Sequence, residues 1–504
     1  LERLRAEEPA LFCEYCLRDS ELVLRILDRT GLAALTAKRA ALTGLSLDLA
    51  WTSIPAFERV YDAALRERRV VPPARNIRSV SGAAGGTVLD PRAGLFEAVL
   101  VFDFRSLYPS LMRTFNIDPL THARAEMAAG GEGGNLIMAP NGARFTREGG
   151  ILPAVIARYT ALREAALEAG DETGAYVYKI LMNSFYGVLG AEGCRYARSE
   201  LAGAITSFAR KYLTFARDFF EERGLRVLYG DTDSVFVESG LGASAGFEAL
   251  SQLGETSATD LNAEVASAIG ADYDLTSFLR IRCEKVYARL FIPELRFDLG
   301  TGARGAIVRR AAAPGDEDDG TEGAGEARGR AKGYAGLRLA GKGCSEVEVK
   351  GMEAARSDGT PLGRRFQTEL LALVFGAGSC GLRAAGKDEV EAWSRRLLAE
   401  LRGGVLDDEL VYRRMLRRPV SEYGSENPAV RAARILGWTD RRGRISWVMT
   451  KAGAEPPEKR SGAPLDYEHY IEHQLWPIAR AVTDEAGWDA WSWFADRPQM
   501  ELGF

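Results

Sequence analysis

The sequence Tyr-Gly-Asp-Thr-Asp-Ser at residues 229–234 lies between two short β-forming runs, 225–228 and 234–238. The turn-forming residues at 230–233 predict a β-hairpin. Because side chains alternate along a strand, Asp231 and Asp233 can point to the same side, so two carboxylates would meet at a strand end. Such like charges repel, and hard cations such as Mg²⁺, which prefer carboxylate and water oxygens, would neutralise them. Taken alone, the same residues also fit a solvated turn.

A third acid follows a second predicted strand. Residues 96–104 are almost continuously apolar except for Asp103. A buried strand rarely carries a charge without a partner or a metal. If this strand lies beside the hairpin, three carboxylates converge on a site that could hold two metals about 3.5 to 4 Å apart. That arrangement suits in-line phosphoryl transfer.

Two further segments carry polar groups in a regular pattern. Residues 103–110, DFRSLYPS, place an acid, a hydroxyl and an aromatic ring just after the strand, and a proline fixes the turn. Residues 179–187, KILMNSFYG, put Lys179, Asn183 and Tyr186 at i, i+4 and i+7 on one helix face. A cation and an amide on one face can hold a triphosphate and its base pair.

These three segments resemble the DxxSLYPS, Kx3NSxYG and YGDTDS motifs of family B DNA polymerases. The likeness extends from about residue 76 to the end, and residues 85–86, 115–119 and 416–423 are most similar to the bacterial DNA polymerase II group. The resemblance implies a mixed α+β fold shaped like a right hand, with an antiparallel-sheet palm, a helical fingers hairpin and a helical thumb. It also implies DNA-directed DNA synthesis by two-metal nucleotidyl transfer.

Carried over residue by residue, the resemblance implies a catalytic set. Asp103 and Asp233 would be the principal ligands of two Mg²⁺ ions, for which Mn²⁺ could substitute. Asp231 would lie beside them, and the carbonyl of Phe104 would reach the second ion. Lys179 would act as general acid to pyrophosphate.

The resemblance also implies a nucleotide-binding set: Ser106, Leu107, Tyr108, Arg163, Lys179, Asn183 and Tyr186. Tyr108 would be a steric gate under the deoxyribose, and the alternative is a plain core aromatic. Arg163 and Lys179 would hold the phosphates, while Asn183 and Tyr186 would line the nascent base pair. Leu167 stands where the family usually has a second lysine, which predicts weaker phosphate binding.

Several positions are predicted to contact primer-template DNA. Residues 331–335 resemble the family's KKRYA segment but keep only Lys332 and Tyr334 of its polar set. Residues 350–358 match the family's KGxExxRxD segment, although isolated charges of this kind are usually solvated. The predicted DNA-binding set is Tyr229, Thr232, Lys332, Tyr334, Lys350 and Arg356.

Both ends of the chain carry weaker motifs. Tyr15 and Asp19 resemble the last YxxxD motif of a 3′ to 5′ exonuclease, or belong to an ordinary helix. The other exonuclease acids would precede residue 1, so we expect a chain truncated at its start and without working exonuclease. At the other end, Gln499, Leu502 and Phe504 fit a peptide that docks on bacterial sliding clamps, the alternative being a frayed tail.

The expected domain division has seven parts. Residues 301–329 are rich in Gly, Ala and charged residues and predict a mobile insertion in the palm. The expected parts are an exonuclease remnant at 1–30, a helical linker at 31–86, palm at 87–150 and 191–362, fingers at 151–190, thumb at 363–498 and a clamp-binding tail at 499–504.

Composition fits a globular enzyme of two to four domains, with 504 residues, 46% hydrophobic and 27% charged. There is no apolar run of roughly 18 residues and no signal core, which argues against a membrane partner and against secretion. The family resemblance implies a cytoplasmic, nucleoid-associated monomer. The net charge is −5, yet arginines crowd residues 413–444, where a duplex backbone could be gripped. Cys13 and Cys16 fit buried helix cysteines better than a metal site. His469 and His473 lack a third ligand.

Two other functions stay open. One is a non-catalytic relative that serves as a DNA- or clamp-binding scaffold, although such relatives usually lose the metal-binding acids. The other is a two-metal nuclease or phosphatase, which would leave the helix of Lys179 without a purpose. The favoured hypothesis is a DNA polymerase acting with deoxynucleoside triphosphates in DNA repair or replication restart.

Overall fold

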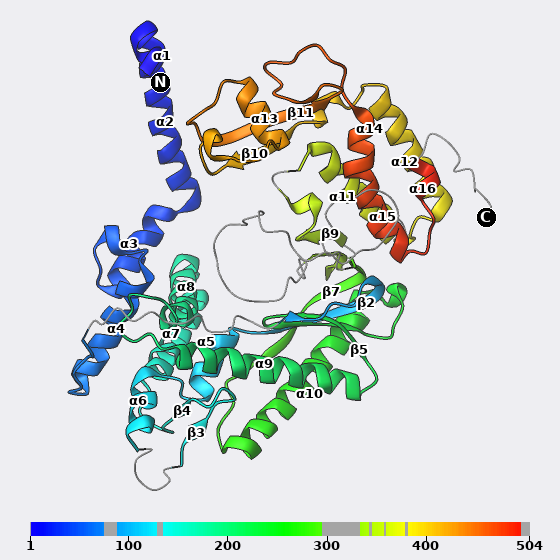
Figure 1. Ribbon diagram of the computed structural model, residues 1–504. Coiled ribbons are helices and arrows are strands. Elements are labelled where there is room, and N and C mark those ends of the chain that lie inside the picture. Colours follow the sequence, from blue (N-terminus) through cyan, green and yellow to red (C-terminus); the bar gives the residue numbers. More distant parts are fainter. Residues whose placement is uncertain are drawn as a thin grey trace. The chain divides into compact units, whose positions relative to one another are not determined.

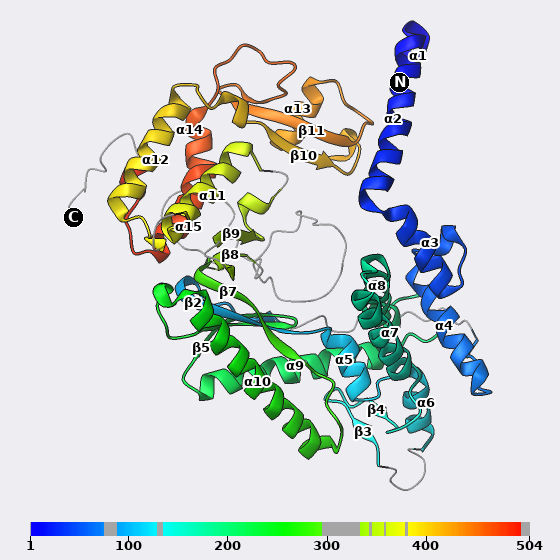
Figure 2. The same cartoon turned by 180° about the vertical axis from the view of Figure 1, so that it is seen from behind.

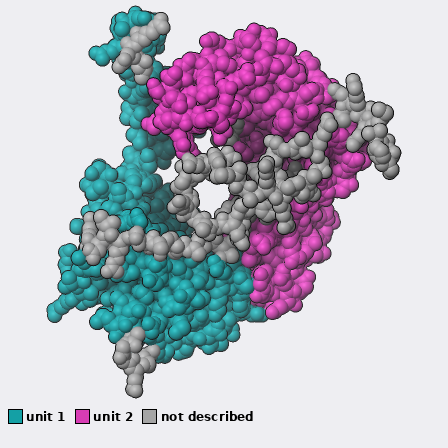
Figure 3. Space-filling model, in the orientation of Figure 1, with its two compact units in different colours: residues 1–87, 104–215, 261–281 teal, residues 88–103, 216–260, 282–504 magenta. Residues whose placement is uncertain are grey.

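The computed structural model divides into two compact units, shown in Figure 3. Unit 1 comprises residues 1–87, 104–215 and 261–281, and unit 2 comprises residues 88–103, 216–260 and 282–504. No helix in the described part of the chain is long and apolar enough to cross a membrane. The structure describes residues 2–74, 88–128, 135–294, 333–341, 345–356, 359–378 and 382–494.

Unit 1 is mainly helical (Figure 1). Gly31 adopts the left-handed conformation (φ 62°) and ends the first long helix. Within the expected helical linker, 31–86, a 3₁₀ turn, Leu47–Leu49, is followed by α4. The elements are α1 (Glu2–Glu7), α2 (Pro9–Thr30), α3 (Leu32–Thr43), α4 (Ser53–Glu67), α5 (Leu107–Thr114), α6 (Pro119–Ala128), β3 (Ile137–Met138), β4 (Arg144–Phe145), α7 (Ile151–Glu168), α8 (Glu172–Leu189) and much of α9 (Ser199–Glu222).

Helices α7 and α8 form an antiparallel hairpin, which confirms the prediction of two helices over residues 151–190. They lie side by side in both Figure 1 and Figure 2. Tyr159 and Tyr178 pack across the hairpin, with ring centroids 5.6 Å apart. At the tip, the side chain of Asp171 caps α8 by accepting a hydrogen bond from the N–H of Gly174 (2.9 Å) and also pairs with Lys38 of α3.

Unit 2 is built on a seven-stranded sheet with the strand order β1-β5-β6-β2-β7-β8-β9. The strand pairs whose register is known are antiparallel, which agrees with the predicted mixed α+β class. The chain enters or leaves unit 1 within β2 and β7. The strands are β1 (Val88–Leu89), β2 (Gly94–Phe104), β5 (Arg226–Asp231), β6 (Ser234–Glu238), β7 (Ile281–Ile292), β8 (Tyr334–Leu339) and β9 (Ser345–Lys350).

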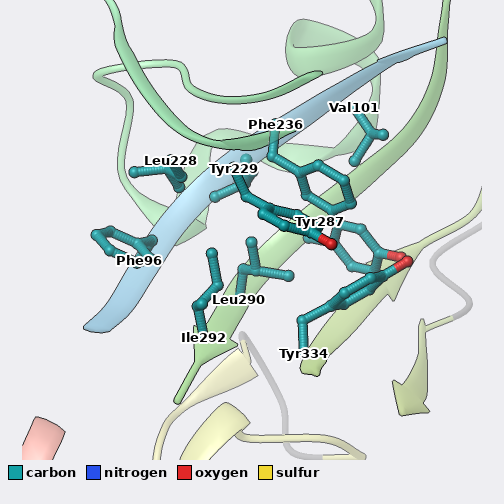
Figure 4. Packing of buried hydrophobic residues seen from close by; sticks show 10 residues of the cluster. Phe96, Val101, Leu228, Tyr229, Phe236, Tyr287, Leu290, Ile292 and Tyr334 are labelled. Atoms are coloured by element: carbon teal, nitrogen blue, oxygen red, sulfur yellow. The ribbon is translucent and has the colours of Figure 1, made fainter. Parts of the chain in front are cut away.

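One face of this sheet carries an aromatic core, shown in Figure 4. It explains why β2 is apolar along nearly its whole length. Helices cover the sheet as well: Phe102 of β2 packs on Phe220 of α9, with ring centroids 4.5 Å apart. The core residues are Phe96, Val99, Val101, Leu228, Tyr229, Phe236, Tyr287, Leu290, Ile292 and Tyr334.

The region expected to form a helical thumb, 363–498, contains strands as well as helices. A three-stranded sheet, β10-β11-β12, interrupts the helices and has its own core around Trp447 and Val430. The elements are α10 (Gly246–Tyr273, entering unit 1 at residue 261), α11 (Pro361–Phe375), α12 (Lys387–Arg402), β10 (Tyr412–Leu416), α13 (Pro428–Ile435), β11 (Gly443–Thr450), β12 (Gly453–Glu455), α14 (Tyr467–Tyr470), a π-helical turn (Ile471–Leu475), α15 (Trp476–Glu485) and α16 (Trp491–Phe494).

One more expectation needs correction. Cys13 and Cys16 are exposed on α2, a helix that has no buried residue, so the prediction of buried cysteines is wrong. The seven expected parts are not tested by the two units, both of which include residues assigned to the palm. The palm, fingers and thumb boundaries stay predictions. The expected insertion at 301–329 lies outside the described residues.

Candidate active site

Of the predicted acids of unit 2, Asp103 lies on β2, Asp231 ends β5, and Asp233 lies in the turn between β5 and β6. Asp103, the penultimate residue of β2, pairs with Ser234 at the start of β6. Ser234 in turn pairs with Asp231 at the end of β5. The backbones of Asp103 and Asp231 therefore flank the same residue at one end of the sheet. This confirms that the Asp103 strand lies beside the hairpin.

The hairpin turn is tighter than the sequence predicted. Strand β5 continues through Asp231, so only Thr232 and Asp233 form the turn. Thr232 has a positive φ of 57°, which is unusual for a β-branched residue and marks a constrained position. Its hydroxyl donates a hydrogen bond to Oδ1 of Asp231 (3.0 Å). The carboxylate of Asp231 is thus partly engaged within the turn.

Asp103 and Asp233 interact through their charges. Burial raises the pKa of Asp103 to about 6, and repulsion by Asp233 and then Glu284 adds to this increase. Arg282 and Lys285 act in the opposite direction. Ionisation of Asp103 is therefore costly in the protein alone, and a bound cation would favour the charged form.

Glu284 is an acid that the sequence reading missed. It lies on β7, the strand next to β2 in the sheet, and its charge contributes to the raised pKa of Asp103. Its neighbour Lys285 pairs with Glu348 of β9 (Nζ to Oε1, 2.6 Å). The signal that marks Asp103 does not mark Glu284, because Arg282 and Lys285 also interrupt this run of residues.

The donor set fits a magnesium site of the usual protein type. Within the described ranges, no three Asp, Glu, His or Cys side chains are grouped closely enough to hold a metal by themselves, so the structure does not reproduce the expected convergence of three carboxylates. Mg²⁺ is generally bound by one or two carboxylates, with water and substrate phosphates completing its shell. Asp103 and Asp233, followed in the chain by the carbonyl of Phe104, could supply such a set.

The residues expected to bind the nucleotide sugar lie in unit 1. Tyr108 is the second residue of α5, and its ring packs against that of Tyr186 of α8 with centroids 4.4 Å apart. Ser106, just before α5, has a positive φ of 51°. The side chain of Leu107 is buried, so only its backbone could meet a nucleotide. Tyr108 is half-buried and is not a plain core aromatic.

Helix α8 presents the expected polar face. Lys179 and Asn183, one turn apart, are exposed, and Tyr186 is half-buried. The opposite face is apolar and buried, with Leu181 and Phe185 among its residues. The helix is therefore oriented by its apolar face, and the two polar side chains point to solvent.

Arg163 of α7 carries an unusual nitrogen. Its Nε is buried and has no hydrogen-bond partner among the residues that the structure describes. A buried donor without a partner is uncommon in proteins and suits a group that meets a ligand. Leu167, one turn further along α7, is 48% exposed and offers no charge to a phosphate.

The predicted DNA contacts include two tyrosines whose side chains are buried. Tyr229 is 3% exposed and Tyr334 is 7% exposed, and both rings belong to the aromatic core of the sheet. Lys350 is exposed above the ring of Tyr334, with Nζ 5.6 Å from its centroid. Arg356 is half-buried, and its Nε lies 3.7 Å from Oε2 of Glu353. The sequence reading treated both tyrosines as DNA contacts, whereas here their side chains serve packing.

One further predicted DNA contact lies in the hairpin turn, and four other predicted contacts lie outside the described residues. Thr232 lies in the hairpin turn described above. Lys332, Gln499, Leu502 and Phe504 lie outside the described residues.

Comparison with known proteins agrees with the motif resemblance. Residues 53–294, which include all three motif segments, match the model of DNA polymerase family B. Over 96% of its length the chain is 32% identical to DNA polymerase II of Escherichia coli. The chain is thus similar to family B DNA polymerases. It spans 57% of the length of that E. coli protein.

Two other family B polymerases are similar over most of the chain. DNA polymerase 2 of Aeropyrum pernix is 27% identical over 90% of the chain and 51% of its own length. The solved structure of the family B DNA polymerase from Pyrobaculum calidifontis has a TM-score of 0.60 and 24% identity, covering 95% of this chain and 57% of that one. This structural likeness shows a shared fold.

Proposed function

We propose that this chain is a family B polymerase that synthesises DNA on a DNA template, adding deoxynucleotides to a primer 3′ end by two-metal nucleotidyl transfer. The observation that carries the proposal is the pair formed by Asp103 and Asp233. Burial of Asp103 and repulsion by Asp233 make the charge of Asp103 costly without a cation, and by the motif resemblance the two acids match the family's principal metal-binding positions. The E. coli relative is named DNA polymerase II.

Each group has a chemical task in this proposal. Bound divalent ions would activate the 3′ hydroxyl and neutralise charge at the transferred phosphate. Asp103 and Asp233 hold the ions, with Asp231 and the Phe104 carbonyl as further ligands. Mg²⁺ is the expected ion, and Mn²⁺ is a substitute.

The nucleotide meets residues of unit 1. Arg163 and Lys179 bind the triphosphate, and Lys179 donates a proton to the departing pyrophosphate. The ring of Tyr108 lies under the deoxyribose and excludes a 2′ hydroxyl. Asn183 and Tyr186 line the new base pair.

Partners and cellular role follow from the same hypothesis. The substrates are primer-template DNA and deoxynucleoside triphosphates, and the expected role is DNA repair or replication restart. Residues 499–504 would dock on a sliding clamp. The chain would act as a cytoplasmic, nucleoid-associated monomer.

Primer extension with Mg²⁺ and all four deoxynucleotides tests the proposal. Asp233→Asn should reduce incorporation by about a thousandfold, because it removes charge where the transition state needs a bound cation. Asp260→Asn makes the same chemical change on the exposed surface of α10 and serves as the matched control, with wild-type activity expected. A wild-type chain that incorporates nothing, or an active Asp233→Asn variant, would contradict the proposal.

One outcome would point to the scaffold function instead. If the purified chain bound primer-template and a sliding clamp but added no nucleotide with either Mg²⁺ or Mn²⁺, a non-catalytic role would replace synthesis.

A further inference from the structure

A single buried carboxylate joins the starts of two helices in unit 1. Asp118 immediately precedes α6 and is fully buried. Its Oδ1 accepts hydrogen bonds from the N–H groups of Leu120 (2.8 Å) and Thr121 (3.2 Å), an ordinary N-cap of α6. Its Oδ2 accepts hydrogen bonds from the N–H groups of Ile151 (3.0 Å) and Leu152 (2.8 Å), the first residues of α7.

The first turn of α7 depends on this distant side chain. The first N–H groups of a helix have no partner within the helix. The N-cap residue of α7 is Gly150, which supplies no side-chain hydrogen bond. A larger residue has no room there, because a Cβ on Gly150 would lie 2.1 Å from Oδ1 of Asn116. Asp118 therefore caps α7 although 33 positions separate it from Ile151.

A third helix contributes to the same carboxylate. The hydroxyl of Tyr61 of α4 donates a hydrogen bond to Oδ1 of Asp118 (3.0 Å) and accepts one from the N–H of Leu120 (3.1 Å). Burial raises the pKa of Asp118, while the hydrogen bonds from Leu152, Tyr61 and others act in the opposite direction. A negative charge is also favourable at the N-termini of two helices. Asp118 is thus a fully satisfied junction of α4, α6 and α7.

This junction connects the elements that carry the nucleotide-binding residues. The chain runs directly from α5, which holds Tyr108, to Asp118, and the N–H of Ile117 donates a hydrogen bond back to Met112 (3.1 Å). Helix α5 packs against both α7 and α8. Helix α7 holds Arg163. The carboxylate of Asp118 therefore fixes the start of one nucleotide-binding helix to the end of another.

We propose that Asp118 is a positioning residue for the incoming nucleotide. It holds the first turn of α7 against the segment that follows α5, and so sets the distance between Arg163 and Tyr108. The inference rests on the proposed function of these two residues. A helix transmits a displacement of its first turn along its length, so losing this cap would move the phosphate contact relative to the sugar contact.

Three substitutions separate the bonds of the junction. Asp118→Ser keeps a hydroxyl that can cap α6 but is too short to reach α7. Asp118→Asn keeps the shape but turns one of the two acceptors into a donor facing N–H groups. Tyr61→Phe removes the hydroxyl and leaves all four backbone hydrogen bonds in place, which makes it the matched control. Leu398→Ala, at a buried position of α12 in unit 2, controls for a general loss of stability.

The measurements are the KM and kcat for a deoxynucleotide, the discrimination against ribonucleotides, and hydrogen exchange of the amides in residues 151–160. With Asp118→Ser and Asp118→Asn, we expect the KM to rise about tenfold with little change in kcat, because placement for binding is lost. Ribonucleotide discrimination should fall, and the amides of 151–160 should exchange faster. Tyr61→Phe and Leu398→Ala should leave the KM and the discrimination at wild-type values.

A wild-type KM in both Asp118 variants would overturn the inference, as would an equal rise in KM with Tyr61→Phe or Leu398→Ala. Failure of the proposed function is distinguishable, because the wild-type chain itself would then extend no primer. Even if the chain extends no primer, amide exchange still tests the cap: unchanged exchange at 151–160 in Asp118→Ser would show that Asp118 does not cap α7.

Discussion

Tyr108 illustrates how one side chain can select a sugar. Its ring is held by Tyr186, with centroids 4.4 Å apart, and it stands in the first turn of α5. A ring fixed in this way can exclude a substituent without moving aside, since the packing partner lies on a second helix. To exclude a nucleotide with a 2′ hydroxyl, Tyr108 needs its ring but not its own phenolic hydroxyl.

Replacing Tyr108 therefore gives a clear prediction. Tyr108→Ala should raise the ribonucleotide to deoxynucleotide ratio of kcat/KM on the order of a hundredfold, because a rigid steric barrier is removed. Tyr108→Phe keeps the ring and should discriminate like the wild type. Single-nucleotide incorporation with matched deoxy and ribo substrates measures both. If the alanine variant still rejects ribonucleotides, Tyr108 is not the steric gate.

His469 predicts a pH-dependent stability. Burial lowers the pKa of this half-buried imidazole below 6.5, the neighbouring His473 adds to the decrease, and Asp466 opposes it. The unfolded chain then binds a proton at a higher pH than the folded chain does. The stability that depends on neutral His469 is fully present above pH 6.5 and is lost as the pH falls through the folded-state pKa.

Thermal unfolding between pH 5 and 8 checks the effect of His469. The free energy of unfolding of His469→Gln should depend less on pH below 6.5 than that of the wild type. His473→Gln should give an intermediate dependence, because it removes the repulsion but not the burial. Identical pH profiles for all three proteins would contradict the assignment.

At the scale of elements, the acid-bearing hairpin depends on a glycine. A Cβ on Gly230 of β5 would lie 2.7 Å from Cδ1 of Leu89, on the neighbouring strand β1, and 3.2 Å from the carbonyl oxygen of Ser234. Strand β1 can thus pair closely with β5 only because residue 230 has no side chain. The close pairing in turn supports the strand that ends in Asp231.

Gly230→Ala should lower the free energy of unfolding by about 1 to 3 kcal/mol, the usual cost of overpacking. Leu89→Ala in the same chain should recover most of that loss, since it removes the nearest colliding group. Gly270→Ala, in α10 with open space around it, should instead stabilise the protein by about 0.5 to 1 kcal/mol. Denaturant titrations of the wild type, of the Gly230→Ala, Leu89→Ala and Gly270→Ala variants, and of the double variant measure these effects. Additive losses in the double variant would show that Leu89 is not the obstacle.

The elements also show what the sequence could predict. Helices α7 and α8 and strand β2 were predictable because local signals agree: a glycine at the tip of the hairpin and a continuous apolar run in the strand. Strand β10 was not, since its consecutive arginines Arg413 and Arg414 break the alternation expected of a strand.

The candidate site divides in the same way. The sequence singled out Asp103 because it is a charge in an apolar run, and Asp233 because it is one of two acids in a predicted turn. Asp118 has a local signal, an Asp before Pro at a helix start, but its second partner is Ile151, and no local rule predicts a contact across 33 positions. The burial of Tyr229, a predicted DNA contact, could not be predicted locally, because its ring packs against Phe236 and Tyr334, residues of other strands.

For the whole molecule, charge is distributed unevenly. The net charge of −5 would oppose binding to DNA if it were spread uniformly. On β10 and β11 the arrangement is different: Arg413 and Met415 lie on one face of β10, and Arg444 pairs opposite Met415. Both arginines are exposed. This part of unit 2 therefore presents two neighbouring cations on one face of a small sheet, whatever the overall charge.

These two cations predict the salt dependence of DNA binding. If Arg413 and Arg444 each neutralise a phosphate, replacing both with Gln should reduce the slope of log K against log salt by about 1.8, because each duplex phosphate contact contributes about 0.9. Primer-template affinity measured by fluorescence anisotropy over a range of salt concentrations gives this slope. Arg18→Gln combined with Arg25→Gln removes the same charge from exposed positions of α2 and should leave the slope unchanged. An equal change in both double variants would mean that net charge, and not this face of the β10-β11 sheet, governs binding.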